Sequence, residues 1–114
     1  MNLDQLTDKI AQVSPERPAQ ALPKRIKEWK DDDRTVDELV YMVEHYFGNT
    51  WIPSEEDHSA CYRIWKEFKE NVISGLGGMT INERLYHFGL FDRYESCPSR
   101  EDQLKIYTKL HAKP

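Results

Sequence analysis

The chain has 114 residues, of which 39% are hydrophobic and 11% aromatic, and its 20 acidic and 16 basic side chains give a net charge of −4. This composition is too apolar and too aromatic for a disordered chain, and the length is that of one domain, so we expect residues 1–114 to form a single domain. The negative net charge argues against general affinity for nucleic acids or anionic membranes.

Apolar residues recur at intervals of three and four along the first half of the chain, which is the pattern of amphipathic helices. Residues 3–13 form the first predicted helix. The second is expected to begin near Pro23, because proline suits the first turn of a helix. The third begins at a capping box, Thr35-x-x-Glu38, and is expected to stop at Gly48.

The second half continues the same pattern. Ser54 is expected to cap a long fourth helix, and a second capping box, Thr80-x-x-Glu83, begins a helix that Gly89 interrupts or ends. A short helical turn follows, and the last helix is expected to start after Ser99. The residues expected on the buried face of the fourth helix are Cys61, Ile64, Trp65, Phe68 and Val72, and those on the last helix are Leu104, Tyr107 and Leu110.

No segment alternates apolar and polar residues between hairpin turns, so no sheet is expected. We therefore predict an all-α fold, a single compact bundle of five or six short-to-medium helices. No apolar stretch approaches the length of a membrane span, and no secretory signal is visible, which favours a cytoplasmic protein. Cys61 and Cys97 are expected to remain reduced thiols in that compartment.

Two short pairings of metal-ligating residues stand out, His58-x-x-Cys61 and Glu83-x-x-x-His87. Each spacing places two side chains on adjacent turns of one helical face. A zinc site needs three or four converging ligands, and no second paired motif supplies the others. We expect no metal, no cofactor and no catalytic residue. The alternative left open is a small metal-dependent or thiol enzyme that uses these four residues.

A basic stretch precedes the third helix and raises a second alternative, a regulatory nucleic-acid adaptor. Its members are Arg17, Lys24, Arg25, Lys27 and Lys30. Because three consecutive aspartates follow at once, the stretch makes a poor footprint for a phosphate backbone, and a solvated face of mixed charge is favoured.

The acidity is concentrated in one third of the chain. Residues 30–60 carry nine acidic and two basic side chains, a net charge of −7, whereas residues 1–29 carry +1 and residues 61–114 carry +2. Trp51 lies between two acidic groups of this segment, and an aromatic anchor surrounded by carboxylates suits a cationic partner. The residues predicted to bind a partner are Asp31, Asp32, Asp33, Asp37, Trp51, Glu55, Glu56 and Asp57. The alternative is that Trp51 folds back onto the core while the acids cap helices and keep the protein soluble.

The segment Met79–Glu95, MTINERLYHFGLFDRYE, resembles a C-terminal segment of small bacterial proteins of poorly assigned function. Some of these are similar to immunity proteins encoded beside polymorphic or contact-dependent toxins. The resemblance implies no catalytic or binding residue. Together with the acidic segment, it leads us to expect a non-enzymatic, cytoplasmic bacterial immunity protein that occludes a cationic, nuclease-like toxin domain.

Overall fold

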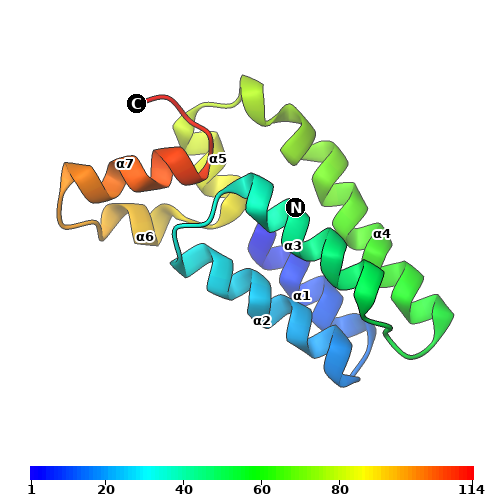
Figure 1. Cartoon of the computed structure of the whole chain (residues 1–114). Helices are drawn as coiled ribbons and strands as arrows, with labels where there is room; N and C mark the ends of the chain where they lie inside the picture. The colour runs from blue at the N-terminus through cyan, green and yellow to red at the C-terminus, as the bar shows by residue number, and fades with distance from the viewer.

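Seven α-helices and one short 3-10 helix make up the fold in the computed structural model, which describes residues 1–114 and contains no β-strand (Figure 1). In chain order the elements are α1 (Leu3–Val13), α2 (Arg17–Asp31), α3 (Val36–Asn49), α4 (Glu55–Asn71), η1 (Ile73–Gly78), α5 (Ile81–Phe88), α6 (Phe91–Glu95) and α7 (Arg100–Lys109). The predicted all-α class is confirmed. There are more helices than predicted, because α6 is a separate helix of only five residues.

Side-chain caps fix where three of the long segments begin. The Thr35 hydroxyl accepts a hydrogen bond from the Glu38 N–H at 3.4 Å, and the Glu38 carboxylate accepts one from the Thr35 N–H at 3.3 Å. Thr80 and Glu83 form the same reciprocal pair at the start of α5. Ser54 caps α4 through its hydroxyl. These local bonds satisfy donors that have no partner within the helix, and the predicted starts of α3, α4 and α5 are confirmed.

The second helix starts earlier than predicted. It begins at Arg17 rather than near Pro23, with Pro18 in its first turn, where the missing N–H is not needed. Pro23 lies inside the helix and cannot donate to the carbonyl of Ala19. Both Ala19 and Pro23 are buried, and this burial offsets the lost hydrogen bond.

The third helix continues past Gly48, where the prediction placed its end. It ends at Asn49, whose side-chain amide donates to the carbonyl of His45 at 2.9 Å. Gly48 does not adopt a left-handed conformation, so it does not terminate the helix. The amide of the next residue supplies the cap instead.

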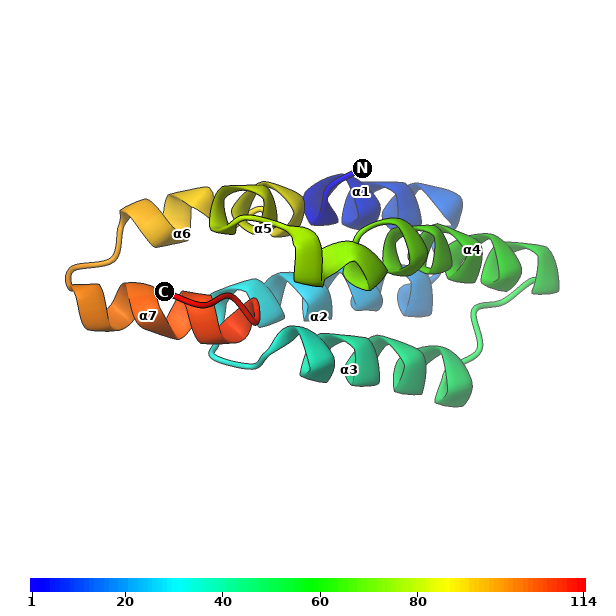
Figure 2. The same cartoon turned by 90° about the horizontal axis from the view of Figure 1, so that it is seen from above.

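Helices α1 to α4 lie side by side, with consecutive helices antiparallel, and α5, α6 and α7 lie at one end of them (Figures 1 and 2). α1 packs against α2 and α4, and α2 packs against α3. The molecule is elongated, with extents of 46 × 26 × 21 Å. None of the helices combines the length and the apolar character that crossing a membrane would require.

Buried aromatic rings join this four-helix part to α5. Trp29 of α2 and Phe88 of α5 have ring centroids 5.7 Å apart, and Phe88 lies equally close, at 5.7 Å, to Phe68 of α4. All three rings are buried in one hydrophobic core. Of the residues predicted on the inner face of α4, those buried are Cys61, Trp65, Phe68 and Val72, and Ile64 is half-buried.

The buried face of α7 differs from the prediction. Leu110 is buried as expected, but Leu104 and Tyr107 are only half-buried, and Ile106 and Lys109 lie inside instead. A buried ammonium group requires polar partners. Lys109 finds them at the corner between α2 and α3, and this fixes which face of α7 turns inward.

Candidate functional site

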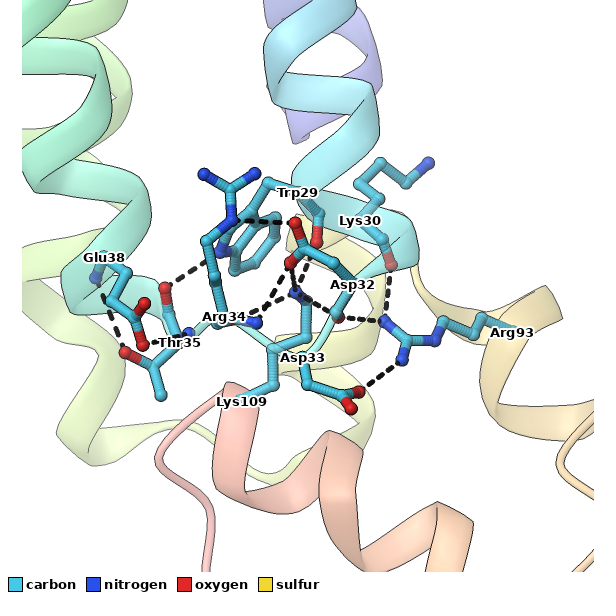
Figure 3. A network of polar contacts seen from close by, with 9 residues as sticks. All are labelled: Trp29, Lys30, Asp32, Asp33, Arg34, Thr35, Glu38, Arg93 and Lys109. Atoms are coloured by element: carbon cyan, nitrogen blue, oxygen red, sulfur yellow. Dashed lines mark hydrogen bonds and ion pairs between the residues drawn. The ribbon is translucent and has the colours of Figure 1, made fainter.

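The first acidic group consists of Asp31, Asp32, Asp33 and Asp37 and lies at the corner between α2 and α3. A network of polar contacts joins this corner to α6 and α7 (Figure 3). Lys109 of α7 is 1% exposed, and its Nζ donates to the carbonyls of Trp29, Asp32 and Arg34. The same nitrogen lies 3.3 Å from Oδ1 of Asp32 and 3.8 Å from the centroid of the Trp29 ring. Carbonyls at the end of α2 and just beyond it are therefore satisfied by a cation from the far end of the chain.

Arg93 of α6 brings a second cation to this corner. Its Nη1 donates to the carbonyls of Lys30 and Asp32, each at 2.7 Å, and its Nη2 donates to Oδ1 of Asp33 at 3.1 Å. Nε of Arg34 donates to Oδ2 of Asp32 at 2.7 Å. Asp32 and Asp33 are thus held by cations from α6, α7 and the α2–α3 loop (Figure 3).

The charges at this corner shift the pKa of both Asp32 and Lys109. Burial opposes ionisation of Asp32, but hydrogen bonds from Arg34 and the charges of Lys109 and Arg34 outweigh it, so the pKa of this carboxyl lies below its ordinary value. Burial lowers the pKa of Lys109 to about 8; Asp32 opposes this change, whereas Arg93 and Arg34 add to it. The ammonium group therefore holds its proton less firmly than an exposed lysine does.

The acids predicted to bind a partner here do not form a free acidic patch. Asp32 and Asp33 bind cations of the chain itself, and Oδ2 of Asp37 lies 3.3 Å from Nε2 of His111. Asp31 is exposed. The structure therefore uses most of this group to attach α6 and α7 to the bundle.

The second acidic group, Glu55, Glu56 and Asp57, forms the first turn of α4. It lies at the other end of α3 from the first group (Figure 1), about 21 Å away along a helix of 14 residues. The two groups therefore do not share one surface. No ion pair involves these three carboxylates. Their charge is favoured by the partial positive charge at the start of the helix.

Trp51 lies in the connector that leads into this turn, and its side chain is 59% exposed. The indole stacks on the imidazole of His58, with ring centroids 4.5 Å apart and 19° between the planes. Nδ1 of His58 accepts a hydrogen bond from the N–H of Ile52 at 3.2 Å, and Ile52 is fully buried. The exposed ring is therefore held in place by its neighbours, and the alternative in which Trp51 folds back onto the core does not occur.

An open groove of about 550 Å³ runs between α3 and α4 next to this aromatic pair. Glu44 lies in the groove and links the two helices, because its carboxylate accepts hydrogen bonds from Tyr62, Trp65 and Lys69. Burial raises the pKa of Glu44, but the hydrogen bonds from Lys69 and Trp65 outweigh it, so the pKa lies below its ordinary value. Arg63 also lines the groove, which therefore has mixed charge.

The residues of the proposed metal or thiol alternative do not come together. Burial, with a smaller contribution from Asp57, raises the pKa of the Cys61 thiol to about 11. Glu83 is engaged in the capping box of α5, and His87 has a buried Nδ1 without a hydrogen-bond partner. No group of three or more histidine, cysteine, aspartate or glutamate side chains converges anywhere in the structure. Both cysteines are free thiols.

Two of the five cations in the basic stretch of the second alternative interact with other side chains of the protein. Nζ of Lys30 pairs with Oδ1 of Asp4 at 2.7 Å. The guanidinium of Arg25 lies 5.2 Å from the centroid of the Tyr46 ring. The other three cations of the stretch are exposed.

Three side chains that shape these regions were not among the predicted site residues, Lys109, Arg93 and Glu44, and His58 was named only in the metal or thiol alternative. Lys109 lies three residues after the buried Ile106 of α7, so the two side chains lie on the same helical face. A charged residue at an apolar helical position was therefore the signal that could have found it. Arg93 has no comparable signal, because only the three-dimensional fold brings it to α2.

Comparisons of the chain with family models, with curated proteins and with solved structures find no match. The resemblance of Met79–Glu95 to immunity-type proteins therefore remains a prediction from sequence. In the structure this segment contains α5, a left-handed Gly89 and α6.

Proposed function

We propose that this protein binds a cationic protein partner through the Trp51 surface, which consists of Trp51, Glu55, Glu56 and Asp57. The observation that carries the proposal is an exposed indole, stacked on His58, in the connector that leads into a helical turn with three carboxylates in no ion pair. A ring already fixed by stacking loses little freedom on binding, and aromatic anchors dominate the energy of many interfaces. Unpaired carboxylates around it accelerate encounter with a positively charged surface.

The role we propose is that of an immunity protein whose partner is a nuclease-like toxin domain. A nuclease presents basic residues to the phosphate backbone of its substrate, and these are complementary to the Trp51 surface. Inhibition by covering that face requires no catalytic group in the inhibitor. The resemblance of Met79–Glu95 supports this role, and the separation of the two acidic groups limits the proposed contact to one end of α3.

The test is binding to basic toxin domains encoded beside this chain, measured with the wild type and two single variants. Trp51→Ala should weaken the complex by about 2 kcal/mol, roughly thirtyfold in Kd, because it removes the central anchor. Glu56→Lys should slow association several-fold at low salt and have a smaller effect at high salt, because the charge acts mainly on encounter. Surface plasmon resonance resolves both effects.

Two matched variants control for changes unrelated to the surface. Tyr86→Ala removes an aromatic side chain that is 55% exposed on α5, and Glu101→Lys reverses the charge of the second residue of α7, as Glu56→Lys does in α4. Both should bind as the wild type does. Equal affinity and equal association rate for all five proteins would remove the Trp51 surface from the interface.

The immunity role has its own readout. Bacteria that express the toxin domain should survive when they produce the wild-type protein at the lowest level that protects them, and Trp51→Ala at that level should protect them less. Equal survival with both proteins at that level would contradict protection through this surface, even if a complex forms.

A further inference from the structure

Another concave region lies between α5 and the end of α7, and Trp51 is not among the residues that line it. It is a cleft of about 570 Å³. Arg84, His111 and Lys113 contribute its basic side chains, and no aspartate or glutamate lines it. This is unusual for a chain with a net charge of −4. Met79 and Ile81 supply apolar walls.

Arg84 is the buried cation that lines the cleft. It is 6% exposed and takes part in no ion pair. Its Nε donates to the carbonyl of Met79 at 3.1 Å, and its Nη1 donates to the carbonyl of Leu110 at 2.7 Å. Nη2 donates to no acceptor. Among the fully buried side-chain nitrogen and oxygen atoms, only Nδ1 of His87 lacks a hydrogen-bond partner, so Nη2 is not fully buried. Nη2 therefore keeps access to solvent, and the residue lines the cleft.

Two other cations inside the fold, Lys109 and Arg93, have carboxylate partners. Lys109, the second charged residue that is buried, lies 3.3 Å from a carboxylate oxygen of Asp32, and Arg93 lies 3.1 Å from one of Asp33. A buried charge normally has such a partner, because removing it from water is costly. Arg84 is the buried cation that lacks one, and its planar guanidinium is the group best suited to bind a carboxylate or a phosphate.

The end of α7 places two further nitrogen-bearing side chains at the cleft. His111 has φ of 55°, a left-handed conformation that is uncommon for a residue other than glycine, and the Ala112 N–H donates to the carbonyl of Tyr107 at 2.8 Å. His111 and Lys113, at and after this turn, both line the cleft. The nearest acid to His111 is Asp37, at 3.3 Å, which does not line the cleft.

We propose that this cleft binds a small molecule that carries a phosphate or carboxylate group. Nη2 of Arg84 donates to an oxygen of that group, Lys113 adds positive charge at the rim, and Met79 and Ile81 contact the body of the ligand. The site is separate from the Trp51 surface, so it does not depend on the proposed immunity role.

The test is a titration of the 15N-labelled full chain with inorganic phosphate, with sodium acetate in a parallel series and sodium chloride at matched ionic strength as the reference. Phosphate or acetate should move the Nε–Hε signal of Arg84 and the amide signal of Lys113 in a saturable manner, and chloride should not. Saturation by only one of the two anions identifies which oxyanion the site takes. Absence of saturable shifts with both anions would overturn the proposal.

Because Arg84 also holds two backbone carbonyls, the variants are made at exposed lysines. Lys113→Glu should weaken binding of the anion about fivefold, since it replaces a favourable charge at the rim with a repulsive one. Lys105→Glu is the matched control, because Lys105 is exposed on α7 and lies outside the cleft. Equal affinities for the two variants would place the anion elsewhere and overturn the assignment.

Discussion

Charged residues at apolar helical positions mark the places where this fold is held together. The three cases are Lys109, three residues after the buried Ile106; Arg84, four residues before the buried Phe88; and Glu44, three residues before the buried Phe47. Periodicity alone places such residues toward the interior. It does not identify their partners, because those of Glu44 lie 18 to 25 residues away and those of Lys109 lie 75 to 80 residues away. The position of each could be predicted from the sequence, and its role could not.

Replacing Lys109 tests how much this interior cation contributes to stability. Lys109→Met keeps the length of the side chain but removes one hydrogen-bond donor from the carbonyls of Trp29, Asp32 and Arg34 and from the Asp32 carboxylate. Loss of the donor from a buried acceptor costs about 1 to 3 kcal/mol. We expect the free energy of unfolding in urea at neutral pH to fall by about that amount.

Lys105→Met is the matched control for this variant. Lys105 lies one turn earlier on α7, is exposed and pairs only with Asp102 at 3.7 Å. An exposed pair contributes less than about 1 kcal/mol, so its loss should hardly change the unfolding midpoint. Equal unfolding midpoints for the two variants would show that the network at the α2–α3 corner does not stabilise the fold.

Helix starts were predicted correctly where a capping box determines them, whereas the start of α2 and the end of α3 were predicted wrongly. The capping boxes at Thr35 and Thr80 involve residues three positions apart, so the sequence contains the complete motif. The start of α2 is different, because the helix extends in front of Pro23, which is buried in the fold. Gly48 is also helical, because the side chain of Asn49 provides the cap that a left-handed glycine would have provided.

Gly89 is the glycine whose conformation the fold requires. It ends α5 with φ of 66°, and a Cβ added there would lie 2.5 Å from Oδ2 of Asp4 and 3.0 Å from Nζ of Lys30. Alanine would therefore strain the backbone and push apart the ion pair between α1 and α2. We expect Gly89→Ala to lower the free energy of unfolding by about 2 kcal/mol, measured by urea denaturation.

Gly48→Ala provides the comparison within the same chain. A Cβ at Gly48 meets nothing within 4 Å, and the residue lies inside α3 with ordinary backbone angles. Alanine there should raise the free energy of unfolding by about 0.5 to 1 kcal/mol, because it restricts the unfolded chain. The prediction for Gly89 is wrong if both alanine variants are at least as stable as the wild type.

At the scale of the whole molecule, the net charge of −7 carried by residues 30–60 does not form one acidic region in space. Two cations of the C-terminal part, Arg93 and Lys109, pair with Asp33 and Asp32 at the α2–α3 corner, whereas the first turn of α4 has no counter-charge. The sequence located the acids, and it placed Trp51 beside those that stay free. It could not separate the two groups, because pairing across 60 to 77 residues depends on how the helices pack.

The buried ammonium at that corner also makes the stability of the whole molecule depend on pH. Lys109 has a pKa of about 8 in the folded protein, against an ordinary value of 10.5. Between these values the unfolded chain binds more protons than the folded one, so the free energy of unfolding rises with pH across this window. Below about pH 8 the lysine is charged in both states and its contribution no longer changes. A shift of this size corresponds to a gain of up to about 3 kcal/mol by pH 10.5.

Other lysines, the tyrosines and Cys61 titrate in the same range, so the gain is measured as a difference between two proteins. The free energy of unfolding of the wild type minus that of Lys109→Met should increase as the pH is raised from about 8 to 10, because groups common to both proteins cancel. Urea denaturation at several pH values gives this difference directly. A difference that stays constant with pH would mean that Lys109 binds its proton equally well in the folded and unfolded states. A difference that decreases would mean that the carbonyls and the Trp29 ring stabilise the charged form more than burial destabilises it.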